Sequence, residues 1–407
     1  MHHLPDHIRW IDTQAQRAQR LLIRWANINS GSTHLAGLAR MADELEKHFG
    51  KLAIVRRHNL PVHRVVDAVG NVTRQPLGQA LSLIKRPRAR RRALLVIHMD
   101  TVYPATARFQ KCDAVRGQRL RGPGVVDAKG GLLVMLLALE ALERSAIGNK
   151  LGWQVIVNPD EELGSPGSSS LLTRAARRCD AGLVFESCMP DGALVSHRKG
   201  SGNFALVVRG RAAHAGRDFD KGRNAVAAAA RAAQALDKMT HARHGITVNV
   251  ARIDGGSPLN QVPDVAVVQF NVRYTDPKHE GDLRTKFDTL IDDINAREGY
   301  RATLHGGFGA PPKPTNDAIE AMLAHVRACG RALGMAITTR PTGGVCDGNR
   351  LVAAGLPTLD TLGPQGGHLH SEQEYVVLPS IVQRAKLTAL LLHRLADDNE
   401  GRASRSQ

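Results

Sequence analysis

The sequence is poor in cysteine and aromatic residues, and it has no long apolar run. Its 407 residues include five cysteines, an odd number without a CxxC pair, so we expect no disulfide framework. No stretch reaches the roughly 18 apolar residues of a membrane-spanning helix. The opening segment, MHHLPDHIRWIDTQAQRAQRLL, lacks the apolar core of a secretory signal. We therefore expect a cytoplasmic protein without membrane contacts.

Acidic residues are also scarce, since 38 Asp and Glu stand against 55 Lys and Arg, a formal net charge of +17. The basic residues are densest in KRPRARRR (85–92), just before an apolar run. Such a cluster can bind nucleic acid by neutralising phosphates. No aromatic residue is interleaved on which bases could stack, so we favour a solvated loop and expect no nucleic-acid partner. Anion or nucleic-acid binding stays open as the non-enzymatic alternative.

The remaining composition is that of an ordinary globular protein. With 43% hydrophobic and 23% charged residues, wholesale disorder is excluded, and the length suggests two or three domains. Before residue 196, short apolar strands alternate with helices, which predicts an α/β domain with a helix-covered mixed sheet. Residues 196–310 instead follow a βαββαβ order, typical of a ferredoxin-like unit. We therefore predict a first domain formed by residues 1–195 and 311–407, with a second domain inserted at 196–310.

Periodicity places individual elements within these domains. Apolar spacing predicts helices in the first 50 residues and a buried helix at GLLVMLLALEAL (131–142). ALLVIH (93–98) is predicted to be a buried strand. In the insert, the last strand is expected at Tyr300–Leu304, and the glycine-rich GGFGAPP (306–312) is interpreted as a return linker.

Residues able to bind metals or move protons follow several predicted strands. In α/β sheets, ligands bind beyond the carboxyl ends of the strands. Taken singly, each fragment has a simpler explanation, such as a loop hydrogen bond or a solvated acidic turn. Together, in successive strand-end loops, they predict one site, whose candidate ligands in chain order are His98, Asp127, Glu162, Glu186 and His370.

The residue types indicate which metal such a site would hold. Two imidazoles with several carboxylates suit zinc, cobalt or manganese better than calcium or magnesium. Adjacent carboxylates facing one crevice, as in Asp160-Glu161-Glu162, repel each other unless a cation neutralises them. The number of ligands fits two metal ions that share one carboxylate.

In these motifs the chain resembles the M20 metallopeptidases, and within them the glutamate carboxypeptidase branch of the carboxypeptidase G2 type. Acetylornithine deacetylases and aminoacylases are relatives in the same family. The resemblance rests on five stretches in a characteristic order: HMDTVYP (98–104), GPGVVDAKGG (122–131), PDEELGSPGS (159–168), HAG (214–216) and GGHLHSEQEY (366–375). It implies a dinuclear zinc hydrolase with a catalytic domain and a smaller lid domain, through which two copies form a homodimer.

The resemblance also implies a role for each candidate ligand. Asp127 would bridge the two metal ions. Glu162 and His370 would complete one metal position, and His98 and Glu186 the other.

Two further acids receive roles from the same resemblance. Asp100 would orient His98, and Glu161 would be the general base. The family often has a second acid after the bridging aspartate, joined to it by a cis peptide bond, whereas this chain has Ala128.

For substrate binding, the resemblance points to the insert. His214 would reach the active site of a partner subunit, and Asn260 would contact substrate. Arg273 is either a substrate ligand or a structural residue. The glutamate-directed branch carries an arginine for the substrate carboxylate before the return linker, but residues 303–308 (TLHGGF) contain none.

The sequence thus predicts a zinc-dependent hydrolase that cleaves an amide bond to release a C-terminal amino acid from a small substrate. An N-acyl-amino-acid deacylase, which cuts the same bond in a differently decorated substrate, is the enzymatic alternative. The non-enzymatic alternative is an anion- or nucleic-acid-binding protein on a hydrolase fold.

Overall fold

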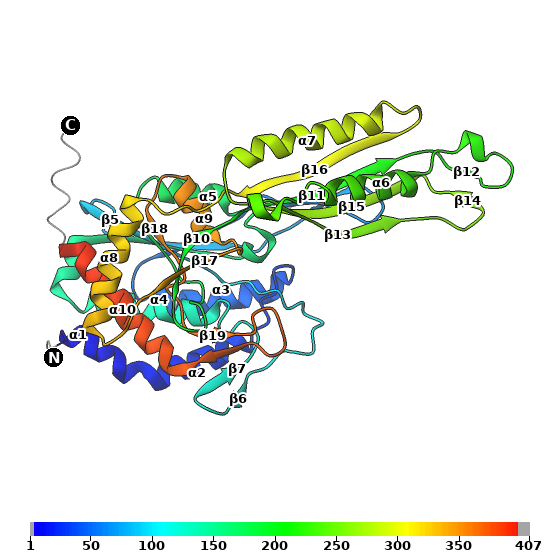
Figure 1. Cartoon of the computed structure of the whole chain (residues 1–407). Coiled ribbons are helices and arrows are strands. Elements are labelled where there is room, and N and C mark those ends of the chain that lie inside the picture. The colour runs from blue at the N-terminus through cyan, green and yellow to red at the C-terminus, as the bar shows by residue number, and fades with distance from the viewer. Residues whose placement is uncertain (1–3, 398–407) are drawn as a thin grey trace.

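A computed structural model describes residues 4–397, and it has two parts (Figure 1). The first is a helix-covered six-stranded sheet, and the second is an elongated four-stranded sheet with two helices that projects away from it. The predicted mixed α/β class is confirmed. Within the described range no helix is both long and apolar enough to cross a membrane. The outermost residues of the predicted first domain, 1–3 and 398–407, lie outside the described residues.

The main sheet has the strand order β1-β4-β8-β5-β9-β18. Its strands β5, β8, β9 and β18 run parallel, whereas β4 is antiparallel to both of its neighbours, β8 and β1. Parallel pairing places His98, at the end of β5, beside Asn158, at the end of β8. The bounds are β1 (Val55–His58), β4 (Ala80–Lys85), β5 (Arg91–His98), β8 (Leu151–Asn158), β9 (Ala181–Val184) and β18 (Thr358–Leu359).

Helices cover both faces of this sheet, which explains the uninterrupted apolar run of β5. Ala93, Leu95 and Ile97 pack into a core with the helices of one face, whereas Leu94 and Val96 pack into a separate core on the other. The helices of the larger core are α1 (Asp6–Arg9), α2 (Ala15–Ala26), α3 (Leu35–Phe49), α4 (Lys129–Glu143), α8 (Asp317–Ala332) and α10 (Leu378–Asp397). The smaller core includes α5 (Ser169–Ala176) and α9 (Asp347–Ala353).

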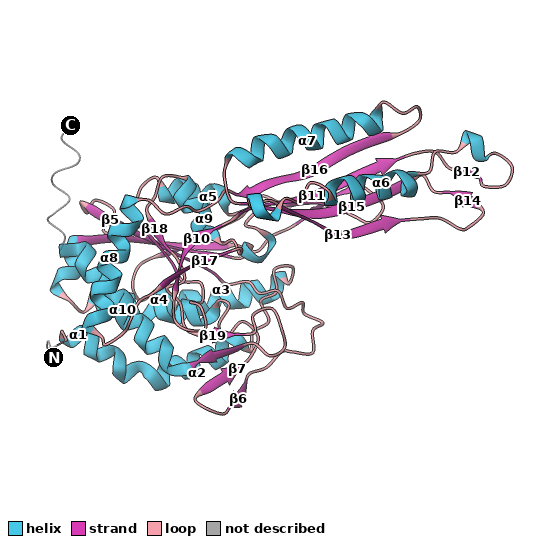
Figure 2. Ribbon diagram, in the orientation of Figure 1, coloured by secondary structure: helices cyan, strands magenta, loops and turns pink. Residues whose placement is uncertain are grey.

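The second sheet, called the inserted unit (residues 200–310), is antiparallel with the strand order β13-β15-β11-β16. Two helices pack against it, and Figure 2 shows them lying along its long strands. Its elements follow a βαββαβ order, apart from two short strands at the tip. The bounds are β11 (Gly200–Arg209), β12 (Ala213–His214), α6 (Ala225–Asp237), β13 (Thr247–Gly255), β14 (Gln261–Val262), β15 (Val265–Tyr274), α7 (Lys278–Asn295) and β16 (Arg301–Ala310).

The prediction for the end of the inserted unit was wrong in one respect. The last strand, β16, does not stop at Leu304 but continues to Ala310, through most of the stretch interpreted as a linker. Gly202 pairs with Phe308, and Ser201 with Ala310. The sequence pattern indicated a break at these glycines. They are compatible with a strand because the hydrogen bonds that pair β16 with β11 come from the backbone and need no side chain.

The strands between residues 55 and 85 were not predicted, and they include a hairpin that reaches the inserted unit. This hairpin consists of β2 (His63–Val66) and β3 (Val72–Gln75). At its tip, the Gly70 carbonyl oxygen accepts a hydrogen bond of 3.0 Å from Arg209 Nη2 of β11. The remaining strands are β6 (Asp113–Val115), β7 (Arg119–Arg121), β10 (Leu194–Arg198), β17 (Thr339–Thr342), β19 (Gly366–Gly367) and β20 (Tyr375–Val377).

The basic cluster 85–92 forms the end of β4, a turn and the start of β5 rather than only a solvated loop. Lys85 Nζ lies 2.7 Å from Glu143 Oε2, and Arg86 forms a bidentate pair with the same carboxylate. Together with a hydrogen bond from Trp153, these contacts lower the pKa of Glu143 to about 2, against the effect of its burial. Two of the basic residues therefore fasten α4 to the sheet.

The two chain crossings between the parts meet at one buried cluster. Arg198 and Lys313 exchange backbone hydrogen bonds of 3.0 Å, and both side chains pair with Asp360, at 2.8 and 3.0 Å. Burial alone would raise the pKa of Asp360, but the two cations lower it to about 2. The junction is thus held by one carboxylate that neutralises a residue from each crossing.

We predict that Asp360→Asn lowers the free energy of unfolding by about 3–5 kcal/mol, because it leaves two buried cations without their counter-charge. Urea-induced unfolding followed by circular dichroism measures this. The matched control is Asp113→Asn, which removes an exposed pair with Arg121 and should cost about 1 kcal/mol or less. Equal effects of the two substitutions would contradict the assignment.

Candidate metal centre

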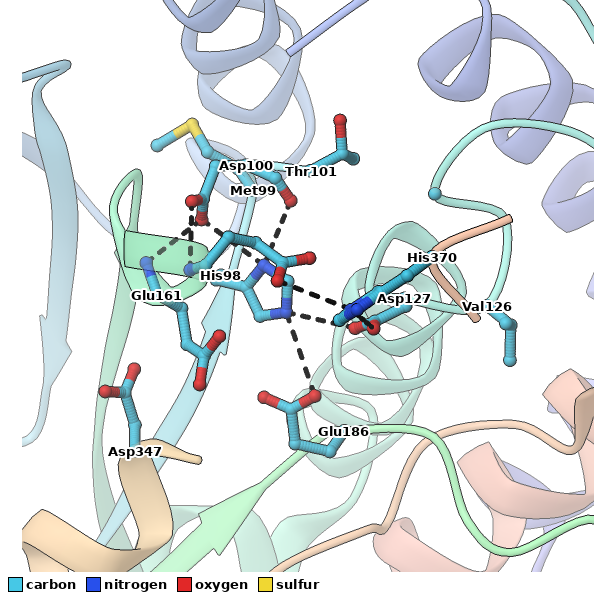
Figure 3. Close-up of polar contacts among 12 residues, drawn as sticks. His98, Met99, Asp100, Thr101, Val126, Asp127, Glu161, Glu186, Asp347 and His370 are labelled. Atoms are coloured by element: carbon cyan, nitrogen blue, oxygen red, sulfur yellow. Dashed lines mark hydrogen bonds and ion pairs between the residues drawn. The ribbon is translucent and has the colours of Figure 1, made fainter. Parts of the chain in front are cut away.

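Five predicted ligands converge at the carboxyl edge of the main sheet, and Figure 3 labels four of them, His98, Asp127, Glu186 and His370. They come from five separate segments of the chain, each positioned by the end of a strand or the start of a helix. The segments are the end of β5 (His98), the turn before α4 (Asp127), the single 3₁₀ turn after β8 (Glu162), the segment after β9 (Glu186) and the loop between β19 and β20 (His370).

Asp127 occupies the middle of this group. Its Oδ1 lies 3.2 Å from His98 Nε2, and its Oδ2 lies 3.2 Å from His370 Nε2. Each imidazole nitrogen faces a second carboxylate as well. His98 Nε2 is 3.7 Å from Glu186 Oε2, and His370 Nε2 is 3.4 Å from Glu162 Oε2. The arrangement therefore consists of two imidazole–carboxylate pairs with one carboxylate between them.

Burial and mutual repulsion oppose the negative charges of the carboxylates in this group, so a bound cation would stabilise them. Burial and then the charge of Asp127 raise the pKa of Glu162 to about 8. Burial would also raise the pKa of Asp127, but hydrogen bonds with His370 and His98 hold it below its usual range. Ligand atoms of His98, Asp127 and Glu162 lie within 4.8 Å of one another. Nitrogen and carboxylate donors at this spacing fit transition-metal ions such as zinc.

Asp100 lies behind His98, away from the other ligands. His98 Nδ1 is 3.3 Å from Asp100 Oδ1 and 3.0 Å from the Asp100 backbone oxygen. A carboxylate on the far nitrogen fixes the tautomer and orientation of a metal-binding imidazole. Asp100 also accepts hydrogen bonds of 3.2 Å from the backbone N–H groups of Glu161 and Glu162. One buried carboxylate therefore orients both His98 and the acidic turn.

Glu161 shares this turn with Glu162, and its side chain points into the same crevice, toward Asp347 and Glu186 in Figure 3. Burial, followed by the charge of Glu186, raises the pKa of Glu161 well above its usual value. Asp347, at the start of α9, accepts hydrogen bonds from Ser165 (2.6 Å) and Asn158 (2.8 Å). These bonds tie α9 to the segment that carries Glu161.

A cleft of about 760 Å³ opens beside the group, and both parts of the chain line it. The main part contributes Glu161 and Glu186, and the inserted unit contributes Arg273. Arg273 Nε donates a hydrogen bond of 2.9 Å to Asn271, whereas its buried Nη1 has no hydrogen-bond partner. The cleft thus contains a guanidinium group with a free donor.

Two predicted substrate residues do not lie at this cleft in the single chain. His214 in β12 and Asn260 just before β14 belong to the tip of the inserted unit, at its far end in Figure 1. They lie side by side there, since the Ala215 N–H donates a hydrogen bond of 2.8 Å to the Asn260 carbonyl oxygen.

Two residues that support the group, Glu374 and Tyr103, have no role that the sequence pattern predicts. Glu374 is fully buried and accepts hydrogen bonds from the backbone of the segment that carries Asp127, and Tyr103 contacts it. Both lie inside the quoted motifs, but nothing in their spacing distinguishes them from core residues. The peptide bond between Asp127 and Ala128 is cis, so the departure at Ala128 has not changed the bond geometry that the resemblance implied.

Residues 94–394 match the family model described as "Peptidase family M20/M25/M40". The chain is 26% identical to carboxypeptidase G2 from Pseudomonas sp. (strain RS-16), over 92% of this chain and 88% of the relative. It is 27% identical to succinyl-diaminopimelate desuccinylase 2 from Shewanella loihica, over 68% of this chain and 77% of the relative. The crystal structure of human carnosine dipeptidase 1 has the same fold, with a TM-score of 0.73, 15% identity and coverage of 96% and 99% of the two chains.

We predict that the protein binds about two zinc ions per chain, as expected for two metals that share a carboxylate. Glu162→Gln and Glu186→Gln should each weaken the binding of one zinc ion, because each replaces the charged carboxylate ligand that faces one of the two histidines. Asp127→Asn should weaken the binding of both zinc ions. Equilibrium dialysis with elemental analysis measures the zinc, and Glu280→Gln, a change in an exposed ion pair of α7, is the control. Two tightly bound ions in Asp127→Asn would contradict the shared-ligand arrangement.

Proposed function

The chain belongs to peptidase family M20/M25/M40, a family of metal-dependent hydrolases, and from this premise we propose that it is a two-zinc amidohydrolase releasing a C-terminal amino acid from a small substrate. Cobalt or manganese would suit the same donors. The observation that supports the proposal most is the Asp127 carboxylate, with one oxygen facing His98 and the other facing His370. Such sharing is characteristic of hydrolytic sites with two metal ions.

When bound, the metal ions would polarise the scissile carbonyl group and lower the pKa of an attacking water molecule. Glu161 acts as general base, because its carboxylate faces the crevice beside Glu186 while its backbone is held by Asp100. It removes a proton from the attacking water and returns that proton to the nitrogen of the leaving amine. Asp100 keeps His98 oriented throughout and takes no proton.

Arg273 binds the carboxylate of the substrate. Its free Nη1 donor lies in the cleft wall, and hydrogen bonds to a charged group of this kind are the strongest that a guanidinium forms. This role does not depend on an arginine in residues 303–308, where the chain has none.

An N-acyl-amino-acid deacylase is the second candidate, since the desuccinylase relative aligns over 68% of this chain. Both reactions break an amide bond and release an amino acid, so they differ only in the acyl group that the cleft accepts. Anion or nucleic-acid binding as the main function has less support. Two residues of its basic cluster, Lys85 and Arg86, are engaged by Glu143.

The inserted unit acts as a lid and joins two copies into a homodimer. The position of His214 and Asn260 at its far tip supports this, because their proposed contact with substrate then requires the active site of a partner subunit. A histidine donor placed there would stabilise negative charge on the substrate oxygen during attack.

To test the proposed function, the zinc-loaded protein is assayed against dipeptides, folate-type conjugates and N-acyl amino acids. We expect hydrolysis of substrates with a free C-terminal carboxylate. Glu161→Gln should lose about 10²–10⁴ in kcat, because the amide cannot accept the proton, while its zinc content is unchanged. Preference for short N-acyl groups would favour the deacylase. A zinc-loaded protein that hydrolyses none of these substrates, or a fully active Glu161→Gln, would contradict the proposal.

The dimer is tested by mixing two inactive variants. His214→Ala and Glu161→Ala should each be nearly inactive alone, because each removes one component of every composite site. Random exchange between the two should restore about a quarter of the parental activity, because half the dimers are mixed and each holds one intact site. Subunit exchange is verified with differently tagged chains. No recovery after verified exchange would place His214 outside the partner's site.

A further inference from the structure

Glu374 is a buried carboxylate that the proposed chemistry does not use. It lies four residues after His370, in the loop between β19 and β20, and its exposed fraction is 0%. A charged group in such a position is costly unless hydrogen bonds satisfy its oxygens. Its contacts therefore need a structural or functional explanation.

Both oxygens of Glu374 are satisfied by the segment that precedes α4. Oε1 accepts hydrogen bonds from the backbone N–H groups of Val126 (2.9 Å) and Asp127 (3.1 Å). Oε2 accepts one from the backbone N–H of Gly124, at 3.0 Å. Three backbone donors thus converge on one carboxylate, and one of them belongs to the residue placed between the two imidazoles.

A fourth contact extends this network to the segment that carries His98. The Tyr103 hydroxyl group lies 2.7 Å from Glu374 Oε2 and 2.8 Å from the Ser371 carbonyl oxygen. Tyr103 follows His98 by five residues, and Ser371 directly follows His370. The Glu374 backbone also accepts a hydrogen bond of 3.1 Å from the Gly122 N–H. The segments of His98, Asp127 and His370 are therefore joined at a single side chain.

We propose that Glu374 is a positioning residue. It fixes the Asp127 backbone relative to His98 and His370 and so determines the zinc affinity of both metal positions together. The proposal rests on the two-metal centre of the proposed function. Its physical basis is that a bridging ligand must be correctly placed for two ions at once, and the Asp127 side chain can only be as well placed as its backbone. Hydrogen bonds around a ligand typically change metal affinity by about 10–100-fold.

A carboxylate, with two acceptor oxygens, matches the backbone donors of this network. Both Glu374 oxygens face N–H donors, whereas a glutamine would turn its NH₂ group toward at least one of them. Glu374→Gln preserves the size of the side chain but introduces a donor–donor conflict next to Asp127 or Gly124. Tyr103→Phe is the milder variant, since it removes one hydroxyl group and leaves the three backbone donors in place.

The experiment measures zinc affinity by competition with a chromophoric chelator, together with the melting temperature of the zinc-free protein. Glu374→Gln should lower the affinity for both zinc ions in parallel, by about 10–100-fold. Tyr103→Phe should lower the affinity for both ions by a smaller factor. The matched control is Glu143→Gln, which disrupts a hydrogen-bonded carboxylate at the base of α4 and should lower the melting temperature without changing zinc affinity.

The outcomes separate this proposal from the proposed function. A parent protein without zinc contradicts the two-metal centre, and the positioning role fails with it. If the parent binds zinc, parental affinity in Glu374→Gln, or loss of one ion alone, overturns the positioning role only. Should Glu374→Gln not fold, Tyr103→Phe decides, since unchanged affinity for both ions in that variant overturns the proposal.

Discussion

The sharing of the Asp127 carboxylate between two imidazoles is the interaction around which the rest of the site is arranged. Its two oxygens each face a different histidine, and each histidine faces one further acid. So many acids cannot stay ionised in a buried crevice without cations, because desolvation and mutual repulsion both oppose their charges. The proposed pair of metal ions would resolve that conflict, and the same ions would supply the chemistry expected of an M20/M25/M40 hydrolase.

The main sheet brings this group together at one edge. Parallel strands β5, β8 and β9 end at one edge, and the turns that follow them present ligands in a common direction. The inserted unit completes the cleft from the other side and carries Arg273. Since its two connections meet at the Asp360 cluster, the orientation of the cleft walls depends on a buried ionic contact, and the Arg198 of that contact itself lines the cleft.

Much of this arrangement could be predicted from the sequence, and the limits have physical causes. The ends of apolar strands and the acids and histidines that follow them are local patterns, so His98, Asp127, Glu162, Glu186 and His370 could be predicted to lie together, as they do. Hydrogen bonds between distant segments leave no such pattern, which is why Glu374 could not be found.

The other limits have similar causes. Glycines in β16 suggested a linker because pairing through the backbone is invisible in side-chain periodicity. The partners of the basic residues 85 and 86 likewise depend on tertiary contacts with α4.

The most direct test of the central claim is anomalous diffraction at the zinc edge from zinc-loaded crystals. We expect two peaks about 3.5–4 Å apart, one beside each oxygen of Asp127. A single peak, or peaks that do not contact Asp127, would contradict it.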